Sequence, residues 1–336
     1  MMKMNLLQIW VLGALAIPAV AADELLPWLE RSNAVFSVHE AAAAADMNAL
    51  RIAAVDKSML NMPDEMGNTA LDIAAAAGHV VAVQYLIGAG AAATEHTLSV
   101  AATPAIRELV MGSVMKRRLE LQLCEGVASR NVTEVRKLLA MGVSPNALTY
   151  DHQMSVLMMA AGDAKIDMVN ILLENGADPN YVNTQSKSVL HIAAAYGSAD
   201  VVTRLLAAGA EPMVQGSNGA TPLHDAVWSH NTETVKALLP AYRAQNFNPD
   251  GQRNGFPIVM AVRDGNQPIV QLFLAAGTNL RHEQFIKQSP LIEAVLYSRE
   301  EIARLLIAAG ADPDARDDKG KSARDYAELK KLNLFK

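Results

Sequence analysis

The chain has 336 residues, of which 51% are hydrophobic, 19% charged and 5% aromatic, and alanine alone contributes 57 residues, so the core is expected to consist of many small contacts. The net charge of −6 excludes electrostatic binding of nucleic acid or anionic lipid as the main activity. The single cysteine excludes an internal disulfide. The sequence also lacks a cluster of Cys and His residues, so it does not indicate a structural zinc site.

Residues 1–21 resemble a bacterial signal peptide. Lys3 supplies a positive charge, the apolar run from Leu6 to Ile17 is too short to span a membrane, and Ala19-Val20-Ala21 offers the small residues that a signal peptidase requires. The mature chain is expected to begin near Ala22. An uncleaved membrane anchor is the alternative. We expect the protein in the periplasm, with secretion as the second choice, and no membrane insertion after cleavage.

The first half of the chain predicts irregular pairs of short helices. Residues 66–79 and 83–91 form the most regular pair, and Val38 to Arg51 predict an alanine-rich pair before it. After it, residues 97–110 predict a shortened pair that lacks a central turn. These segments form a first block, residues 33–115, of two repeats and a compressed one.

The junction with the second half has an unusual length. The charged sequence Lys116-Arg-Arg-Leu-Glu120 is expected to open a new helix pair that ends at Gly142. Only 52 residues separate Gly90 from Gly142, which is neither one nor two of the periods found downstream. A bend or a seam between two blocks is therefore expected here, and residues 116–336 form a second block of about six repeats, with a polar C-terminal cap.

From residue 155 onward the sequence repeats itself in steps of 33, 33, 35, 33 and 33 residues. The residues that open the repeats are Ser155, Ser188, Thr221, Phe256, Ser289 and Ser322. Each period predicts two short helices; some of the first helices carry an alanine pair, and most of the second helices carry paired leucines. A fixed period of this size is typical of a solenoid, in which each unit buries its apolar face against its neighbours.

Two segments carry a resemblance to a known family. Thr221-Pro-Leu-His-Asp-Ala-Val227 and Ile302-Ala-Arg-Leu-Leu-Ile-Ala-Ala-Gly-Ala-Asp-Pro-Asp314 resemble the first and second helices of the ankyrin repeat. The resemblance implies an all-α solenoid of helix-turn-helix units with a concave binding face. Leucine pairs of the second helix, Leu205-Leu206 and Leu305-Leu306, are expected to pack into the next repeat. Four glycines are expected to end second helices in a left-handed conformation, namely Gly176, Gly209, Gly277 and Gly310.

The sequence contains no constellation that indicates an enzyme, a metal site or a cofactor. The resemblance implies that His191 and His224 bond to neighbouring backbone, and His39 and His79 are placed with them. The histidines at positions 152 and 282 are expected in solvated loops. Cys124 has apolar neighbours at i−3 and i+3, which favours a buried small hydrophobic side chain over a redox-active thiol.

Protein recognition is the function that the resemblance implies. In the family, variable residues follow the alanine pair of the first helix and occupy the hairpin tips between repeats. The first set contains Tyr196, Trp228, Arg263 and Tyr297, which belong to the residue types enriched at binding hot spots. The alternative to a binding role is that Trp228 and Tyr196 fill gaps against the next repeat. Hairpin tips add Tyr150, His152, Gln185, Gln252, Arg253, Phe285 and Ile286.

We therefore expect a non-enzymatic, monomeric scaffold that binds another protein, with no cofactor, no metal and no nucleic acid. The chain resembles bacterial periplasmic ankyrin proteins, which implies that it supports a peroxide-removing enzyme in stress defence. The alternative is an antagonist, either an immunity-type protein that neutralises a toxin or a secreted effector that binds a foreign or host protein.

Overall fold

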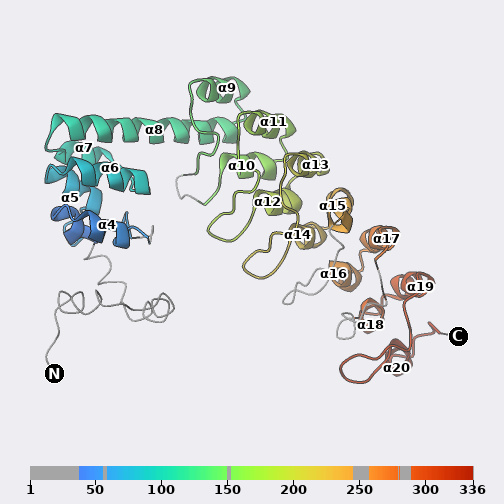
Figure 1. Ribbon diagram of the computed structural model, residues 1–336. Helices are drawn as coiled ribbons and strands as arrows, with labels where there is room; N and C mark the ends of the chain where they lie inside the picture. The colour runs from blue at the N-terminus through green and yellow to red at the C-terminus, as the bar shows by residue number, and fades with distance from the viewer. Residues whose placement is uncertain are drawn as a thin grey trace, which may run out of the picture. The chain divides into compact units, whose positions relative to one another are not determined.

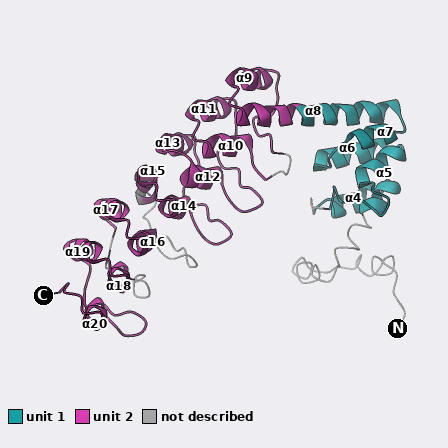
Figure 2. Cartoon of the chain, turned by 180° about the vertical axis from the view of Figure 1, so that it is seen from behind, with its two compact units in different colours: residues 1–118 teal, residues 119–336 magenta. Residues whose placement is uncertain are grey.

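The computed structural model describes residues 38–55, 59–149, 153–244, 257–278, 280 and 289–335. The chain divides into two compact units, residues 1–118 and 119–336, which are coloured separately in Figure 2. The expected signal peptide lies outside the described residues. Within them the secondary structure is helical, apart from three isolated β-bridges, so the all-α prediction is confirmed.

The described part of the first unit opens with helical residues 38–43. Its further helices are α4 (Met47–Ala53), α5 (Ala70–Ala76), α6 (Val80–Ala89), α7 (Glu95–Val100) and the first part of α8 (Pro104–Ala128). Thr69 caps α5 through a reciprocal bond pattern with Asp72, which is typical of the capping box. The Thr97 hydroxyl of α7 donates to Asp72 Oδ1 over 2.6 Å, so the same carboxylate also joins α5 to α7.

Helix α8 corrects the prediction for residues 104–128. A break was expected before Lys116, but the structure has one continuous helix of 25 residues. No proline or loop sequence interrupts the stretch, and Met, Lys, Arg, Leu and Glu residues favour helix on both sides of Gly112. A single glycine inside a helix costs only about 1 kcal/mol, so it does not end this one. The second helix of one repeat is thus continuous with the first helix of the next.

In the second unit the helices form two layers, one of first helices and one of second helices (Figure 1). The first helices after α8 are α10 (Val156–Gly162), α12 (Val189–Tyr196), α14 (Pro222–Trp228), α16 (Pro257–Asp264), α18 (Pro290–Leu296) and α20 (Ala323–Leu329). The second helices are α9 (Val132–Ala140), α11 (Ile166–Glu174), α13 (Ala199–Ala207), α15 (Thr232–Ala244), α17 (Gln267–Ala275) and α19 (Glu300–Ala308). From α10 onward, first helices pack against the first helix of the next repeat and against the second helix of their own.

The residues that start and end these helices recur with the sequence period. Ser155 and Ser188 accept an N–H bond from the residue three positions ahead, which satisfies an open donor in the first turn. The second helices end at a glycine with a φ between +79° and +93° in four repeats, as the sequence predicts. These glycines are Gly176, Gly209, Gly277 and Gly310. At Gly209 a Cβ atom would meet nothing within 4 Å, so the backbone conformation rather than crowding favours glycine.

Asparagine side chains join consecutive repeats at the loops that follow the second helices. Asn146 Oδ1 accepts a bond from the backbone N–H of Asp178 over 2.8 Å, and Asn180 Oδ1 accepts one from Glu211 over the same distance. In the first unit, Asn61 Oδ1 accepts from the backbone of Ala92 over 2.7 Å. Each bond spans 31 or 32 residues, so it fixes the register between one repeat and the next.

The second helices also correct the predicted register of the leucine pairs. Leu205 lies four residues before Gly209, and Leu306 lies four residues before Gly310, so these two leucines are equivalent. Leu305 is instead the equivalent of Arg204. Leu205 and Leu306 are fully buried, whereas Leu305 is only half-buried. The expectation that Leu305 packs as Leu205 does was wrong by one position, because two adjacent leucines conceal which of them faces the core.

We expect Leu205→Ala and Leu306→Ala each to lower the free energy of unfolding by about 2–5 kcal/mol, since each leaves a cavity in a closely packed core. Leu305→Ala is the matched control and should cost less than half as much, because its side chain is already partly in solvent. Urea denaturation followed by circular dichroism measures all three. A loss for Leu305→Ala equal to that for Leu306→Ala would contradict the corrected register.

Candidate functional site

The predicted binding residues lie at the C-terminal ends of the first helices. We define the helix-end stripe as the residues seven and eight positions after the residue that opens each repeat. From α10 to α20 these are Gly162 and Asp163, Ala195 and Tyr196, Trp228 and Ser229, Arg263 and Asp264, Leu296 and Tyr297, and Leu329 and Lys330. Because consecutive first helices pack side by side, the stripe crosses one layer of the second unit (Figure 1).

Large apolar side chains of the stripe are exposed to solvent. The exposed fraction is 73% for Tyr196, 64% for Trp228, 51% for Tyr297 and 66% for Leu329. Elsewhere in the described part of the second unit, the exposed large hydrophobic residues are Val132, Met141 and Val182. Side chains that filled gaps against the next repeat would be buried, so that alternative does not describe Tyr196 or Trp228.

The stripe differs from the sequence expectation in two respects. Trp228 and Arg263 occupy the first of its two positions, whereas Tyr196 and Tyr297 occupy the second, so the four residues form two adjacent columns. Sequence reasoning also missed Leu329, which stands at the position of Trp228. Extending the 33-residue step from Leu296 by one repeat reaches Leu329, although the charged residues around it favour a polar cap.

Arg263 makes an ion pair with the following repeat. Its Nε lies 3.0 Å from Glu293 Oε2 and its Nη2 lies 2.7 Å from Glu293 Oε1, which is a bidentate geometry. The bonds to Glu293 raise the pKa of Arg263 above its ordinary value. The guanidinium is therefore part of the contact between α16 and α18, and only its remaining exposed surface is available to a partner.

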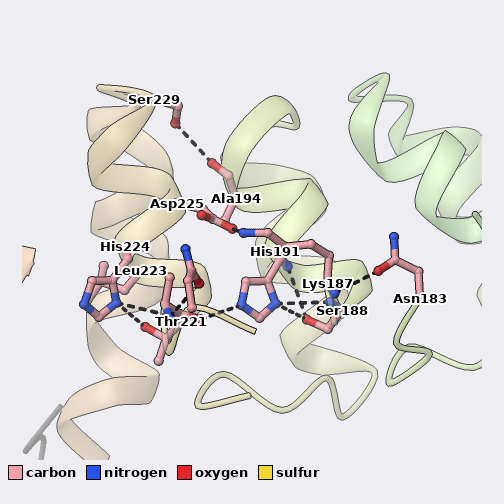
Figure 3. A network of polar contacts seen from close by, with 12 residues as sticks. Asn183, Lys187, Ser188, His191, Ala194, Thr221, Leu223, His224, Asp225 and Ser229 are labelled. Atoms are coloured by element: carbon pink, nitrogen blue, oxygen red, sulfur yellow. Dashed lines mark hydrogen bonds and ion pairs between the residues drawn. The ribbon is translucent and has the colours of Figure 1, made fainter. Parts of the chain in front are cut away.

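A second ion pair joins the repeats of α12 and α14. Lys187 precedes α12 in the sequence, and its Nζ lies 2.7 Å from Asp225 Oδ2 of α14 (Figure 3). The Asp225 side chain is almost completely buried, and the Lys187 side chain is about a quarter exposed. Both ion pairs thus use a carboxylate on a first helix and a cation from the preceding repeat.

The residues predicted at hairpin tips are mostly not described. Gln185 is exposed, and its Nε2 donates to Gln153 Oε1 over 3.3 Å, which joins two neighbouring tips. The others lie outside the described residues, namely Tyr150, His152, Gln252, Arg253, Phe285 and Ile286. His282 lies outside them as well.

The buried histidines bond to backbone rather than form a chemical site. His191 Nδ1 accepts the backbone N–H of Ser188 over 3.1 Å, so its proton resides on Nε2, which donates to the carbonyl of Ala220 over 3.0 Å (Figure 3). His224 makes the same Nδ1 contact with Thr221. The structure thus places both residues in the backbone role that the sequence predicted.

Two histidines of the first unit also contact backbone in neighbouring repeats. His39 Nε2 lies 3.1 Å from the carbonyl of Asn68, and His79 Nε2 lies 2.9 Å from that of Ala43. Cys124 is buried, as predicted, and its thiol donates to the carbonyl of Leu148. Among the described residues no group of three or more His, Cys, Asp or Glu residues could hold a metal ion.

In the part of the chain that the structure describes, no helix combines the length and the apolar character needed to cross a bilayer.

Acid should weaken the fold through His191. Burial lowers the pKa of His191 below its ordinary value of 6.5, and the nearby positive charges of Lys187 and His224 lower it further. The hydrogen bond to Ala220 and the charge of Asp225 raise the pKa, but they do not cancel the effect of burial. Below pH 6.5 the unfolded chain therefore binds a proton that the folded chain does not, and stability falls by up to about 1.4 kcal/mol per pH unit. Urea titrations of wild type and His191→Gln between about pH 7.5 and 5 should show a shallower slope for the variant. Parallel slopes would contradict this role.

Family models match most of the second unit. Residues 125–216, 157–250 and 243–317 match a model described as ankyrin repeats (3 copies), and residues 66–95 match a model of the ankyrin repeat. No curated protein matches the chain in sequence.

Solved structures of ankyrin repeat domains resemble the chain. The ankyrin repeat domain of Bcl-3, described as a unique member of the IkappaB protein family, is 20% identical with a TM-score of 0.53, and the match covers 62% of this chain and 97% of that one. The human ASB11 ankyrin repeat domain is 32% identical with a TM-score of 0.51, and the match covers 61% and 90% of the two chains. The first likeness concerns the fold alone.

Proposed function

Because this chain belongs to the ankyrin repeat family, we propose that it holds a partner protein against the helix-end stripe. Ankyrin repeats are protein interaction scaffolds that typically bind other proteins, and the family is generally not enzymatic. The proposal concerns where on this scaffold the partner binds.

The exposure of the stripe is the observation that carries the proposal. Tyr196, Trp228, Tyr297 and Leu329 leave more than half of their surface in solvent at equivalent helix ends. Large apolar side chains exposed at equivalent positions of neighbouring helices favour association, and aromatic side chains offer a large contact area at low entropic cost. The neighbouring side chains of the same first helices, such as Val227 and Val295, are buried, so a partner at the stripe need not disturb the core.

Replacing Trp228 should test the site directly. We expect Trp228→Ala to weaken partner binding by at least about 2 kcal/mol, the usual threshold of a hot spot, with little change in thermal stability because the side chain is largely exposed. Met141→Ala is the matched control, since Met141 is similarly exposed but lies outside the stripe. Partner captured from cell extract is titrated against all three proteins by calorimetry. Equal affinity for wild type and Trp228→Ala would refute the site.

We also propose that the protein acts in the periplasm, supported by the signal-like pattern of residues 1–21. Its partner is proposed to be a peroxide-removing enzyme, supported by the resemblance to periplasmic ankyrin proteins. Capture of a toxin or a host protein instead would favour the antagonist function.

Export has a direct measurement. Protein expressed from the full-length chain should appear in the periplasmic fraction with an N-terminus near Ala22, because Ala19 and Ala21 fit the peptidase requirement. N-terminal sequencing reads the result, and a membrane-bound product that retains Met1 would contradict export with cleavage.

A further inference from the structure

Three cations on or next to the first helices are bonded to oxygens of the chain itself. Arg263 pairs with Glu293, and Lys187 pairs with Asp225. The Arg299 guanidinium donates to the carbonyl of Arg263 through Nε and Nη2, at 3.2 and 3.0 Å. These contacts reduce the positive charge that this layer presents to an acidic partner.

The C-terminal end of the stripe follows the same pattern. Lys330 Nζ donates to the carbonyl of Leu296 and lies 3.3 Å from Ser298 Oγ. At the other end, Asp163 lies 3.6 Å from Arg130. Asp264 is an exposed carboxylate within the stripe, so its local charge is small. A surface of this kind is complementary to an uncharged segment.

The spacing of the stripe further restricts the partner. Its apolar residues stand on first helices that pack against each other, and packed helices lie about 8–10 Å apart. A polyproline II segment advances about 9.3 Å per turn of three residues. Two residues of a β-strand span about 6.8 Å and one turn of an α-helix about 5.4 Å, both shorter than the helix spacing, whereas two helical turns span about 10.8 Å and exceed it. The polyproline II turn lies within the range.

Resting on the partner-binding role proposed above, we propose that the stripe binds an extended, uncharged segment rich in proline and aliphatic residues. Every third residue of the segment contacts one repeat. The exposed rings of Tyr196 and Trp228 bind two successive contact residues, three positions apart in the segment, as aromatic surfaces do with polyproline II ligands. From α12 to α20 the segment needs about 13 residues. The α16 position, where Arg263 is paired, tolerates any residue.

Selection from a phage-displayed library of random peptides of about 16 residues on the full chain tests this binding mode. Enriched peptides should carry proline or aliphatic residues at roughly every third position of a common register, except opposite α16, with little net charge. Their affinity, measured by fluorescence polarisation, should fall at least about tenfold for Trp228→Ala and Leu329→Ser and stay within about twofold for Met141→Ala. Raising NaCl from about 50 to about 300 mM should change it less than about twofold. Thermal melts establish that each variant is folded.

Other outcomes overturn the inference. Peptides with helical spacing, charged peptides with strong salt dependence, peptides that bind both stripe variants normally, or no enrichment at all would each exclude the proposed segment. The titration of captured partner with Trp228→Ala is independent of the library. If the library result is negative and that partner still depends on Trp228, the inference fails while the proposed function stands. If the partner does not depend on Trp228, the proposed function fails as well.

Discussion

The second unit depends on side chains of one repeat that satisfy backbone groups of the next. The loop after a second helix has open N–H and C=O groups that the repeat itself does not bond. Asn180 supplies both partners from the preceding repeat, since its Oδ1 accepts from Glu211 N and its Nδ2 donates to Gly209 O. His191 provides the same kind of link between first helices through the carbonyl of Ala220. The Ala220 carbonyl is buried, so leaving it unbonded would be costly, and this link favours one register over a slipped arrangement. The Asn180 bonds are exposed to solvent and add directional contacts in the same register.

A second set of links reaches backward and holds the helix ends where the stripe lies. Asn231 Nδ2 donates to the carbonyl of Gly197, and Arg299 donates to that of Arg263. Both donors follow a first helix and contact the end of the preceding one. The stripe is therefore exposed at its side chains while its backbone is bonded from repeat to repeat, which suits a surface that must keep its spacing when a partner binds.

The sequence predicted what the period controls and missed what depends on the individual helix. The starts of α12 and α14, the terminal glycines and the backbone role of His191 all recur with the repeat, so one clear repeat was enough to place the others. Continuity of α8 depends on the lack of a stop signal rather than on a motif. The pairing of Arg263 with Glu293 joins residues 30 positions apart, and the spacing alone did not show that a candidate binding side chain had a partner within the chain.

The repeat with the 35-residue step shows how the links are kept when the pattern fails. Tyr242 lies eleven residues after the cap residue Asn231, where Gly209 lies eleven residues after Ser198, and α15 continues through it instead of ending at a left-handed glycine. The Tyr242 side chain is fully buried, which raises its pKa, and its hydroxyl donates to the carbonyl of Pro212 over 2.6 Å and accepts from Leu223 N. One phenol thus joins the preceding loop to the start of α14. The glycine turn is one way to close a repeat, whereas the bonds between repeats are what holds the solenoid in register.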